Sequence, residues 1–193
     1  MRVISGDCGG IPLKAVPGKT TRPTTDKIKE AMFNLIGQYL SGGAVLDFYA
    51  GSGALGIEAL SRGGDVVYGF ERDRKAIATI EQNVDKVHAT ARYHLFKGDN
   101  QKRLKQLRMD EPDLQFQWVF LDPPYKAQRL VPLLEEFQAE NWLDEEVIVV
   151  CELGAEDTLP DQISQLHKVK EAVYGITRIV CYCFPLDISQ TDE

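Results

Sequence analysis

An aspartate, two prolines and a tyrosine stand together in the segment VFLDPPYKAQ, residues 119–128. Proline has no N–H to donate and restricts the residue before it, so this segment predicts a stiff, extended exit from a buried strand. The Asp122 carboxylate and the Pro123 carbonyl are hydrogen-bond acceptors. Such acceptors can hold the N–H groups of a nucleobase amine, localise its lone pair and aim it at a methyl donor. Tyr125 offers an aromatic face on which the base can stack.

A glycine-rich loop stands earlier in the chain, in VLDFYAGSGALGIEAL. Gly51, Gly53 and Gly56 form a G-x-G-x-x-G pattern between a predicted strand and a predicted helix. Glycines there allow a tight turn, close approach of a ligand to the backbone and close helix–strand packing. Glu71 ends the next strand, twenty positions after Gly51, where a carboxylate can accept hydrogen bonds from ribose hydroxyls. Together these features predict a nucleoside-containing cofactor.

The glycine pattern alone is compatible with NAD, FAD or S-adenosylmethionine. Asp47 lies inside the first strand, four positions before Gly51, where it suits a cationic amino-acid moiety better than a pyrophosphate. Asp99 ends the third strand and can accept from the amine of an adenine. It can equally cap the helix that starts near Asn100. These carboxylates favour S-adenosylmethionine and leave both roles of Asp99 open.

Strands and helices alternate along the middle of the chain. The predicted strands span 45–50, 66–71, 93–97, 117–121 and 146–151, and the predicted helices span 54–62, 73–87, 100–108 and 127–140. This alternation predicts an α/β fold, with a mainly parallel sheet covered by helices on both faces. Two strand-like runs around Gly175 predict a C-terminal antiparallel hairpin. The glycine loop and Asp122 should then meet at the carboxyl ends of neighbouring strands.

The N-terminal part differs from this pattern. Glycines and prolines break residues 1–22 into short pieces that predict a hairpin or arm. A helix is predicted in TTDKIKEAMFNLIGQYL, capped by Thr24 or Thr25. Its apolar face comprises Ile28, Met32, Leu35, Ile36 and Tyr39. We therefore divide the chain into an N-terminal arm and helix, 1–40, and a Rossmann-like domain, 41–193.

Composition is typical of a soluble globular protein, with 193 residues, 44% hydrophobic and 26% charged. No apolar run is long enough to span a bilayer and the N-terminus does not read as a signal peptide, so we expect a cytoplasmic protein and no membrane partner. The four cysteines and three histidines show no metal-site spacing, and we expect reduced, buried thiols.

The net charge is −7, yet residues 1–30 carry six Lys and Arg against three acids. A basic arm on an acidic body can bind a polyanion locally.

The chain resembles the RsmD-type 16S ribosomal RNA guanine-N2 methyltransferases. The similar segments occur in the family's order and include MRVISG, TRPTTDKIKEAMFNLI, LDFYAGSGALGIEALSRG, FERD, LDPPY and YGITRIVCY. The resemblance implies a class I S-adenosylmethionine-dependent methyltransferase fold. It also implies methyl transfer to the exocyclic N2 of one guanine in 16S rRNA, in the small ribosomal subunit or an assembly intermediate. Nothing in the sequence requires more than a monomer.

The resemblance also implies roles for single residues. Gly51, Gly53 and Asp47 would hold the methionine part of the cofactor, Glu71 the ribose and Asp99 the adenine amine. The predicted cofactor site is completed by Tyr49, Ser52, Arg72 and Asn100. The target guanine would be held by Asp122, Pro123, Pro124 and Tyr125. The family's Arg-Pro-Thr segment, near the cofactor or RNA entrance, corresponds to Arg22, Pro23 and Thr24.

Other functions remain open on the residues alone. One is an amino methyltransferase that acts on adenine or cytosine in DNA, or on a protein glutamine; the chain leaves little room for a separate DNA-recognition domain. Another is a ribosome-assembly factor that has kept the fold and lost catalysis. The arm has no Lys or Arg from 3 to 13, which predicts weak binding to naked RNA. An NAD dehydrogenase ranks last, because no hydride-transfer constellation stands out.

Overall fold

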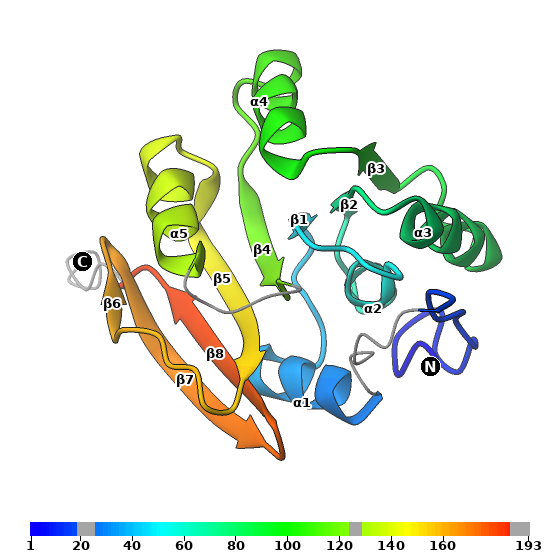
Figure 1. Cartoon of the computed structure of the whole chain (residues 1–193), viewed down its shortest axis with the longest axis horizontal. Coiled ribbons are helices and arrows are strands. Elements are labelled where there is room, and N and C mark those ends of the chain that lie inside the picture. The colour runs from blue at the N-terminus through cyan, green and yellow to red at the C-terminus, as the bar shows by residue number, and fades with distance from the viewer. Residues whose placement is uncertain (19–25, 124–128, 186–193) are drawn as a thin grey trace, which may run out of the picture.

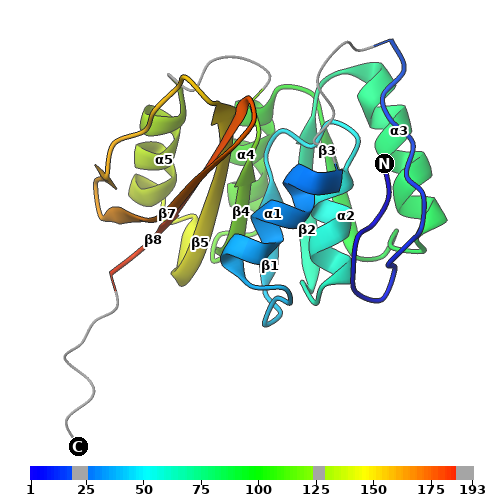
Figure 2. The same ribbon diagram turned by 90° about the horizontal axis from the view of Figure 1, so that it is seen from below.

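A computed structural model describes residues 1–18, 26–123 and 129–185. Within this part of the chain, eight strands form one sheet in the order β3-β2-β1-β4-β5-β8-β7-β6 (Figure 1). Helices cover both faces of the sheet, as Figure 2 shows from below. The predicted α/β architecture is therefore confirmed.

Five strands form the parallel part of the sheet. They are β1 (Ala44–Asp47), β2 (Val66–Glu71), β3 (Tyr93–Lys97), β4 (Phe116–Leu121) and β5 (Leu143–Gly154). The bounds of β2 and β3 agree with the prediction. β1 ends three residues earlier than predicted, because the chain turns after Asp47 to begin the glycine loop. β5 is longer than predicted, because β8 pairs with it as far as Gly154.

The C-terminal part of the sheet is antiparallel. It comprises β6 (Gln162–Ile163), β7 (Leu166–Tyr174) and β8 (Thr177–Cys183). β7 and β8 form the predicted hairpin, and Gly175 adopts a positive φ of 61° in its turn. The two-residue strand β6 was not predicted from the sequence. Cys151 and Cys181 are buried in β5 and β8, whereas Cys8 and Cys183 are partly exposed, contrary to the prediction.

The two faces of the sheet have separate hydrophobic cores. One core joins the sheet to the N-terminal segment and to three helices, α1 (Asp26–Ile36), α2 (Ala54–Ser61) and α3 (Arg74–Lys86). The opposite core joins the sheet to α4 (Asn100–Asp110) and α5 (Leu130–Ala139). The strand order reverses between β1 and β4, so a ligand site is expected at the carboxyl ends of these two strands.

The N-terminal segment folds back on itself. Arg2 forms an antiparallel bridge with Pro12, and the Val3 amide donates to the Ile11 carbonyl. α1 ends at Ile36 because Gly37 takes a positive φ of 109°. Tyr39 therefore lies beyond the helix and is 65% exposed, which corrects its assignment to the apolar face. The division of the chain at residue 40 stays a prediction.

Candidate active site

The predicted site residues gather at the carboxyl edge of the sheet. Asp47 ends β1 and Glu71 ends β2, while Asp122 directly follows β4. Asp47 is in register with Gly69 of β2 and with Phe120 of β4, so the three strands end side by side. In Figure 2 this edge lies at the top of the sheet. The fold thus brings together carboxylates that are 75 positions apart in the chain.

Asp47 is the most deeply buried of these carboxylates, with 2% of its surface exposed. Its Oδ2 accepts a hydrogen bond of 3.0 Å from the Gly56 amide, at the start of α2. Burial raises the pKa of Asp47 to about 7. The hydrogen bond opposes that shift, and the negative charges of Asp122 and Glu71 add to it. The charges of Asp122 and Glu71 therefore act on Asp47 through space, and a bound cation would relieve this repulsion.

Glu71 ties the end of β2 to the glycine loop. Its Oε2 accepts from the Gly51 amide at 2.9 Å, and its Oε1 accepts from the amides of Arg72 and Asp73 at 2.8 and 2.9 Å. A carboxylate has about four lone-pair sites, so three are already used. Binding both ribose hydroxyls, as predicted, would require Glu71 to release at least one backbone N–H. The predicted role of Glu71 remains a prediction with this added cost.

The glycines of the loop serve different purposes. Gly51 and Gly53 have φ of 56° and 78°, which side chains rarely adopt. Among the described residues, a Cβ on Gly51 would meet nothing closer than 4.0 Å, so this part of the chain leaves the space beside Gly51 open to a ligand. A Cβ on Gly56 would lie 2.9 Å from both the Tyr93 ring and the Val67 side chain. Gly56 therefore lets α2 pack close to the sheet, as the pattern predicted.

The third strand leads to two polar residues at the start of α4. Asp99 is the N-cap of this helix, and its Oδ1 accepts from the Lys102 amide at 3.0 Å. The capping role is confirmed, and the adenine role stays a prediction for the remaining acceptor sites. Asn100 donates from Nδ2 to the Phe48 carbonyl, so it links α4 to the loop after β1. Arg72 is exposed beside Glu71.

The side chains of Tyr49 and Ser52 contact different parts of the structure. Tyr49 packs against the core under α4 and α5, edge-on to Phe48, with the ring centroids 5.1 Å apart. Burial raises the pKa of Tyr49, and the nearby Arg129 at the start of α5 opposes this. Ser52 instead faces the N-terminal segment, where its Oγ lies 3.8 Å from the Met1 sulfur. Their cofactor roles stay predictions.

Asp122 and Pro123 are half-buried at the end of β4. The charge of Asp122 contributes to the raised pKa of Asp47, so the two carboxylates lie within electrostatic range of each other. The remaining residues predicted to bind the substrate lie outside the described part of the chain: Arg22, Pro23, Thr24, Pro124 and Tyr125.

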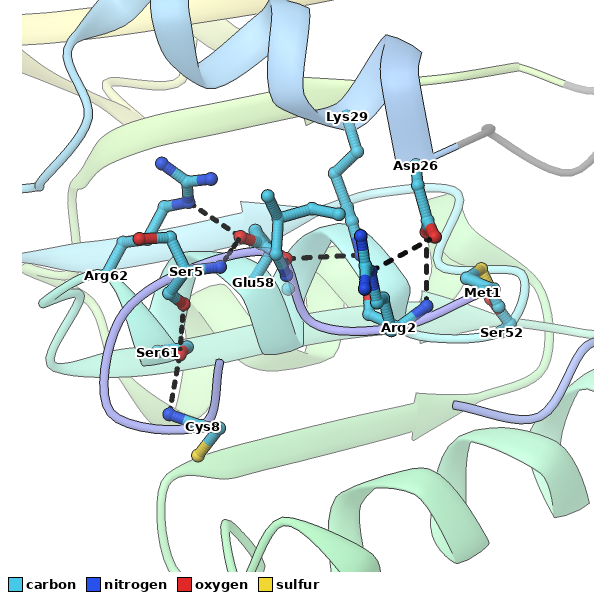
Figure 3. Close-up of polar contacts among 12 residues, drawn as sticks. Met1, Arg2, Ser5, Cys8, Asp26, Lys29, Ser52, Glu58, Ser61 and Arg62 are labelled. Atoms are coloured by element: carbon cyan, nitrogen blue, oxygen red, sulfur yellow. Dashed lines mark hydrogen bonds and ion pairs between the residues drawn. The ribbon is translucent and has the colours of Figure 1, made fainter. Parts of the chain in front are cut away.

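Sequence reasoning missed a buried ion-pair cluster beside the site, drawn in Figure 3. Glu58 of α2 is fully buried and lies 3.1 Å from the Lys29 ammonium of α1 and 2.7 Å from the Arg62 guanidinium. Its carboxylate also accepts from the amides of Ile4 and Ser5. Burial lowers the pKa of Lys29, and Glu58 opposes that shift. Glu58 thus joins the N-terminal segment, α1 and α2.

Asn83 of α3 is a second anchor that the sequence analysis did not single out. It is fully buried, and its Nδ2 donates to the carbonyls of Ser52 and Lys14. Its Oδ1 accepts from the Lys14 amide at 2.8 Å. Asn83 therefore joins the glycine loop, at Ser52, to the N-terminal segment, at Lys14. A charged or amide residue on an otherwise apolar helix face, as in GIEALS, is the signal that could have revealed such anchors.

The chain is similar to known proteins over most of its length. The family model described as Conserved hypothetical protein 95 matches residues 1–183. The chain belongs to this family. "Putative rRNA methyltransferase YlbH" of Bacillus subtilis is 43% identical over 94% of this chain and 98% of that protein. "Ribosomal RNA small subunit methyltransferase D" of Haemophilus influenzae is 32% identical over 94% of this chain and 93% of that protein. The resemblance to the RsmD-type family is confirmed.

Solved structures agree with the family. A Streptococcus pyogenes structure titled as a conserved hypothetical protein is 40% identical, with a TM-score of 0.75 over 81% of this chain and 95% of that one. The structure titled "Putative methyltransferase yhhF from Escherichia coli" is 28% identical, with a TM-score of 0.80 over 95% and 97% of the two chains. The class I methyltransferase fold is confirmed, and with it S-adenosylmethionine as the cofactor of the family.

The described ranges contain neither a membrane-spanning helix nor a metal-binding cluster. None of the helices in these ranges is both long and apolar enough to cross a bilayer. In the same ranges, no three His, Cys, Asp or Glu side chains are grouped so that they could hold a metal ion.

Proposed function

We propose that this protein transfers a methyl group from S-adenosylmethionine to the exocyclic N2 of one guanine in 16S rRNA, within the small ribosomal subunit or an assembly intermediate. The names of the curated relatives support an rRNA substrate. The observation that carries the proposal is the group of interacting carboxylates, Asp47, Glu71 and Asp122, around the open side of the glycine loop. These negative charges would favour the binding of a cationic methyl donor beside Asp122, the residue that would hold the amine.

The residues fit the cofactor. S-adenosylmethionine supplies a methyl group on a positively charged sulfur, and its amino-acid part carries an ammonium group. Asp47 and Glu71 form a negative environment in which these charges are favourable. The open space beside Gly51 allows a ligand to approach the backbone. Glu71 retains one acceptor site for a ribose hydroxyl, and Asp99 retains acceptor sites for the adenine.

Asp122 and Pro123 would prepare the substrate amine. The lone pair of an exocyclic amine is delocalised into the base, so the amine is a weak nucleophile. The Asp122 carboxylate and the Pro123 carbonyl can accept its two N–H groups and orient the lone pair. The nitrogen becomes acidic as the new N–C bond forms, so its proton passes to Asp122 or to water. The reaction therefore demands orientation and does not demand a strong base.

Nucleoside mass spectrometry tests the proposal. Small ribosomal subunits that lack the modification are incubated with the protein and S-adenosylmethionine, and the 16S rRNA is digested to nucleosides. We expect N2-methylguanosine. If no methylated nucleoside appears while calorimetry shows that the cofactor binds, the RNA-guanine function is wrong. The DNA, protein and non-catalytic alternatives then take its place.

The Asp122→Ala variant tests the assigned role of the carboxylate. We expect transfer to fall by about 100-fold or more, because the amine loses its orienting acceptor. Cofactor affinity should change little, since Asp122 lies at the substrate side of the site. Turnover at the wild-type rate would show that Asp122 does not hold the amine.

A further inference from the structure

The hairpin of β7 and β8 carries most of the exposed large apolar side chains. Six such side chains are exposed in the described part of the chain, and four of them belong to this hairpin: Val169, Val173, Tyr174 and Ile176. Single exposed apolar side chains are normal on a protein surface, whereas a contiguous group of them marks a site of interaction. The last three surround one turn, with exposed fractions of 50%, 39% and 67%. We call these three residues the apolar tip.

The turn makes the apolar tip narrow. Tyr174 pairs with Thr177 at the end of the hairpin. Only Gly175 and Ile176 lie between them, and Gly175 takes the positive φ that a two-residue turn needs. Side chains alternate between the faces of a strand, so Val173 and Tyr174 project to opposite faces. A tip with apolar side chains on both faces fits into a groove of a partner better than onto a flat surface.

The apolar tip lies at the same edge of the sheet as the candidate active site. β5 runs parallel to β4, and Leu121 at the end of β4 is in register with Cys151. Thr177, which begins β8, is in register with Gly154, three residues further along β5. The turn therefore projects beyond the end of β4, and in Figure 2 it lies at the top of the sheet. Only β5 separates β8 from β4, so the tip is about 10 Å to the side of the end of β4.

Charge is unevenly distributed along the chain. Residues 130–166 contain ten Asp and Glu but neither Lys nor Arg. The remaining residues carry 22 Lys and Arg against 19 acids, a net charge of +3. The acidic range comprises α5, β5, β6 and the loop that joins β5 to β6. RNA phosphates are therefore repelled from this part of the molecule.

The loop after β5 places an acidic side chain beside the apolar tip. The Ala155 amide donates to the Ile176 carbonyl at 3.0 Å, so the loop leaves β5 next to the turn. Glu156, the next residue, is exposed. A partner that covers the apolar tip therefore meets a negative charge at its rim.

Two cations of the hairpin do not offset this charge. Arg178, next to the turn, forms an ion pair with Glu171. Lys170 lies four residues before Tyr174, or about 13 Å along the strand, and salt screens charges beyond about 10 Å. Its ammonium donates to the Leu35 carbonyl of α1. The surface around the apolar tip thus favours a basic partner.

We propose that the apolar tip and Glu156 dock onto a basic protein surface of the particle that carries the target RNA. This inference rests on the proposed function. Proteins bind RNA through Lys and Arg, so the proteins of a ribosomal particle present cations that complement Glu156. Tyr174 supplies an aromatic anchor, a residue type that contributes strongly to binding at interfaces. This contact compensates for the weak RNA binding predicted for the N-terminal arm.

Photo-crosslinking identifies the partner. p-Benzoylphenylalanine replaces Ile176, and in a control protein it replaces Met109, which is 77% exposed near the end of α4, at the opposite edge of the sheet. Each protein is irradiated with small ribosomal subunits that lack the modification. We expect a cross-link from position 176 to a protein segment rich in Lys and Arg. The inference is overturned by cross-links to RNA or to a second copy of this chain, or by a yield no higher than that from position 109.

Charge reversal separates a protein partner from RNA. Glu156→Lys should raise KM for the particle by about 3- to 10-fold at low salt, and by less at high salt. Glu145→Lys is the matched control, because Glu145 is exposed near the other end of β5 and its reversal changes the net charge equally. If RNA covered the tip, Glu156→Lys would lower KM instead. That result, or equal effects of the two variants, would contradict the inference.

Truncation of the aromatic anchor tests the apolar part of the surface. Tyr174→Ser should raise KM for the particle by about 5- to 30-fold and leave kcat and S-adenosylmethionine affinity unchanged, since the tip touches neither reactant. A wild-type KM would show that the tip does not dock. The proposed function is judged separately: if the wild type forms N2-methylguanosine, negative results here remove only the docking surface. If it forms none, the proposed function fails first, and this inference with it.

Discussion

Replacing Glu58 by glutamine removes the charge at the centre of the buried cluster and keeps the size of the side chain. Glu58 and Lys29 have no exposed side-chain surface, and Arg62 has 3%. Two cations would then remain buried without their anion. The amides of Ile4 and Ser5 would compete for the single remaining acceptor oxygen.

The expected loss is large. Removing one partner of a buried ion pair costs about 3–5 kcal/mol of unfolding free energy, because the other charge stays uncompensated. In a chain of this size, 1 kcal/mol corresponds to about 2–4 °C in Tm. The Glu58→Gln variant should therefore melt about 6–20 °C below the wild type. The amides of Ile4 and Ser5 should also exchange faster with deuterium.

Urea denaturation and hydrogen exchange measure these effects. Glu81→Gln is the matched control, since Glu81 pairs with Lys97 on the surface with 52% of each side chain exposed. Surface pairs contribute about 1 kcal/mol or less. If the two variants unfold within about 1 kcal/mol of each other, the buried cluster does not stabilise the attachment of the N-terminal segment.

Three further predictions concern the cofactor site. The pKa of Asp47 is raised from 3.8 to about 7. Between these pH values the folded state binds one proton that the unfolded state does not bind. The free energy of unfolding therefore falls by up to about 4 kcal/mol as the pH rises through this range. Asp47→Asn should lack this pH dependence. In urea titrations, its free energy of unfolding minus that of the wild type should therefore be higher at pH 8 than at pH 5. The same difference at both pH values would contradict the raised pKa of Asp47. Gly56→Ala should destabilise the protein, because overpacking against Tyr93 and Val67 costs about 1–3 kcal/mol and outweighs the roughly 1 kcal/mol gained in helix propensity; a raised Tm would refute this. Tyr93→Phe should keep or raise the Tm, because the buried Tyr93 hydroxyl has no partner among the described residues; a clear fall would show that the hydroxyl is bonded.

Local patterns in the sequence were enough to predict much of the fold. Turn residues and the alternation of apolar runs depend only on neighbours along the chain, so the bounds of β2 and β3 and the turn at Gly175 followed directly. The G-x-G-x-x-G loop was recognisable for the same reason, since its glycines meet needs of the local backbone. The end of α1 was missed, because a glycine with positive φ at position 37 outweighed the helical periodicity that reached Tyr39.

Tertiary structure alone decided how the site is assembled. The raised pKa of Asp47 depends on burial and on Asp122, which is distant in the chain and close only through strand pairing. Glu58 is buried against residues more than fifty positions away, and its place on an apolar helix face does not show which partners it binds. Likewise, the position of the apolar tip at the carboxyl edge of the sheet follows from strand register. The sequence by itself therefore determined most of the elements and the predicted chemistry of single residues. Their charges, neighbours and shared edge come from long-range packing, which local spacing does not encode.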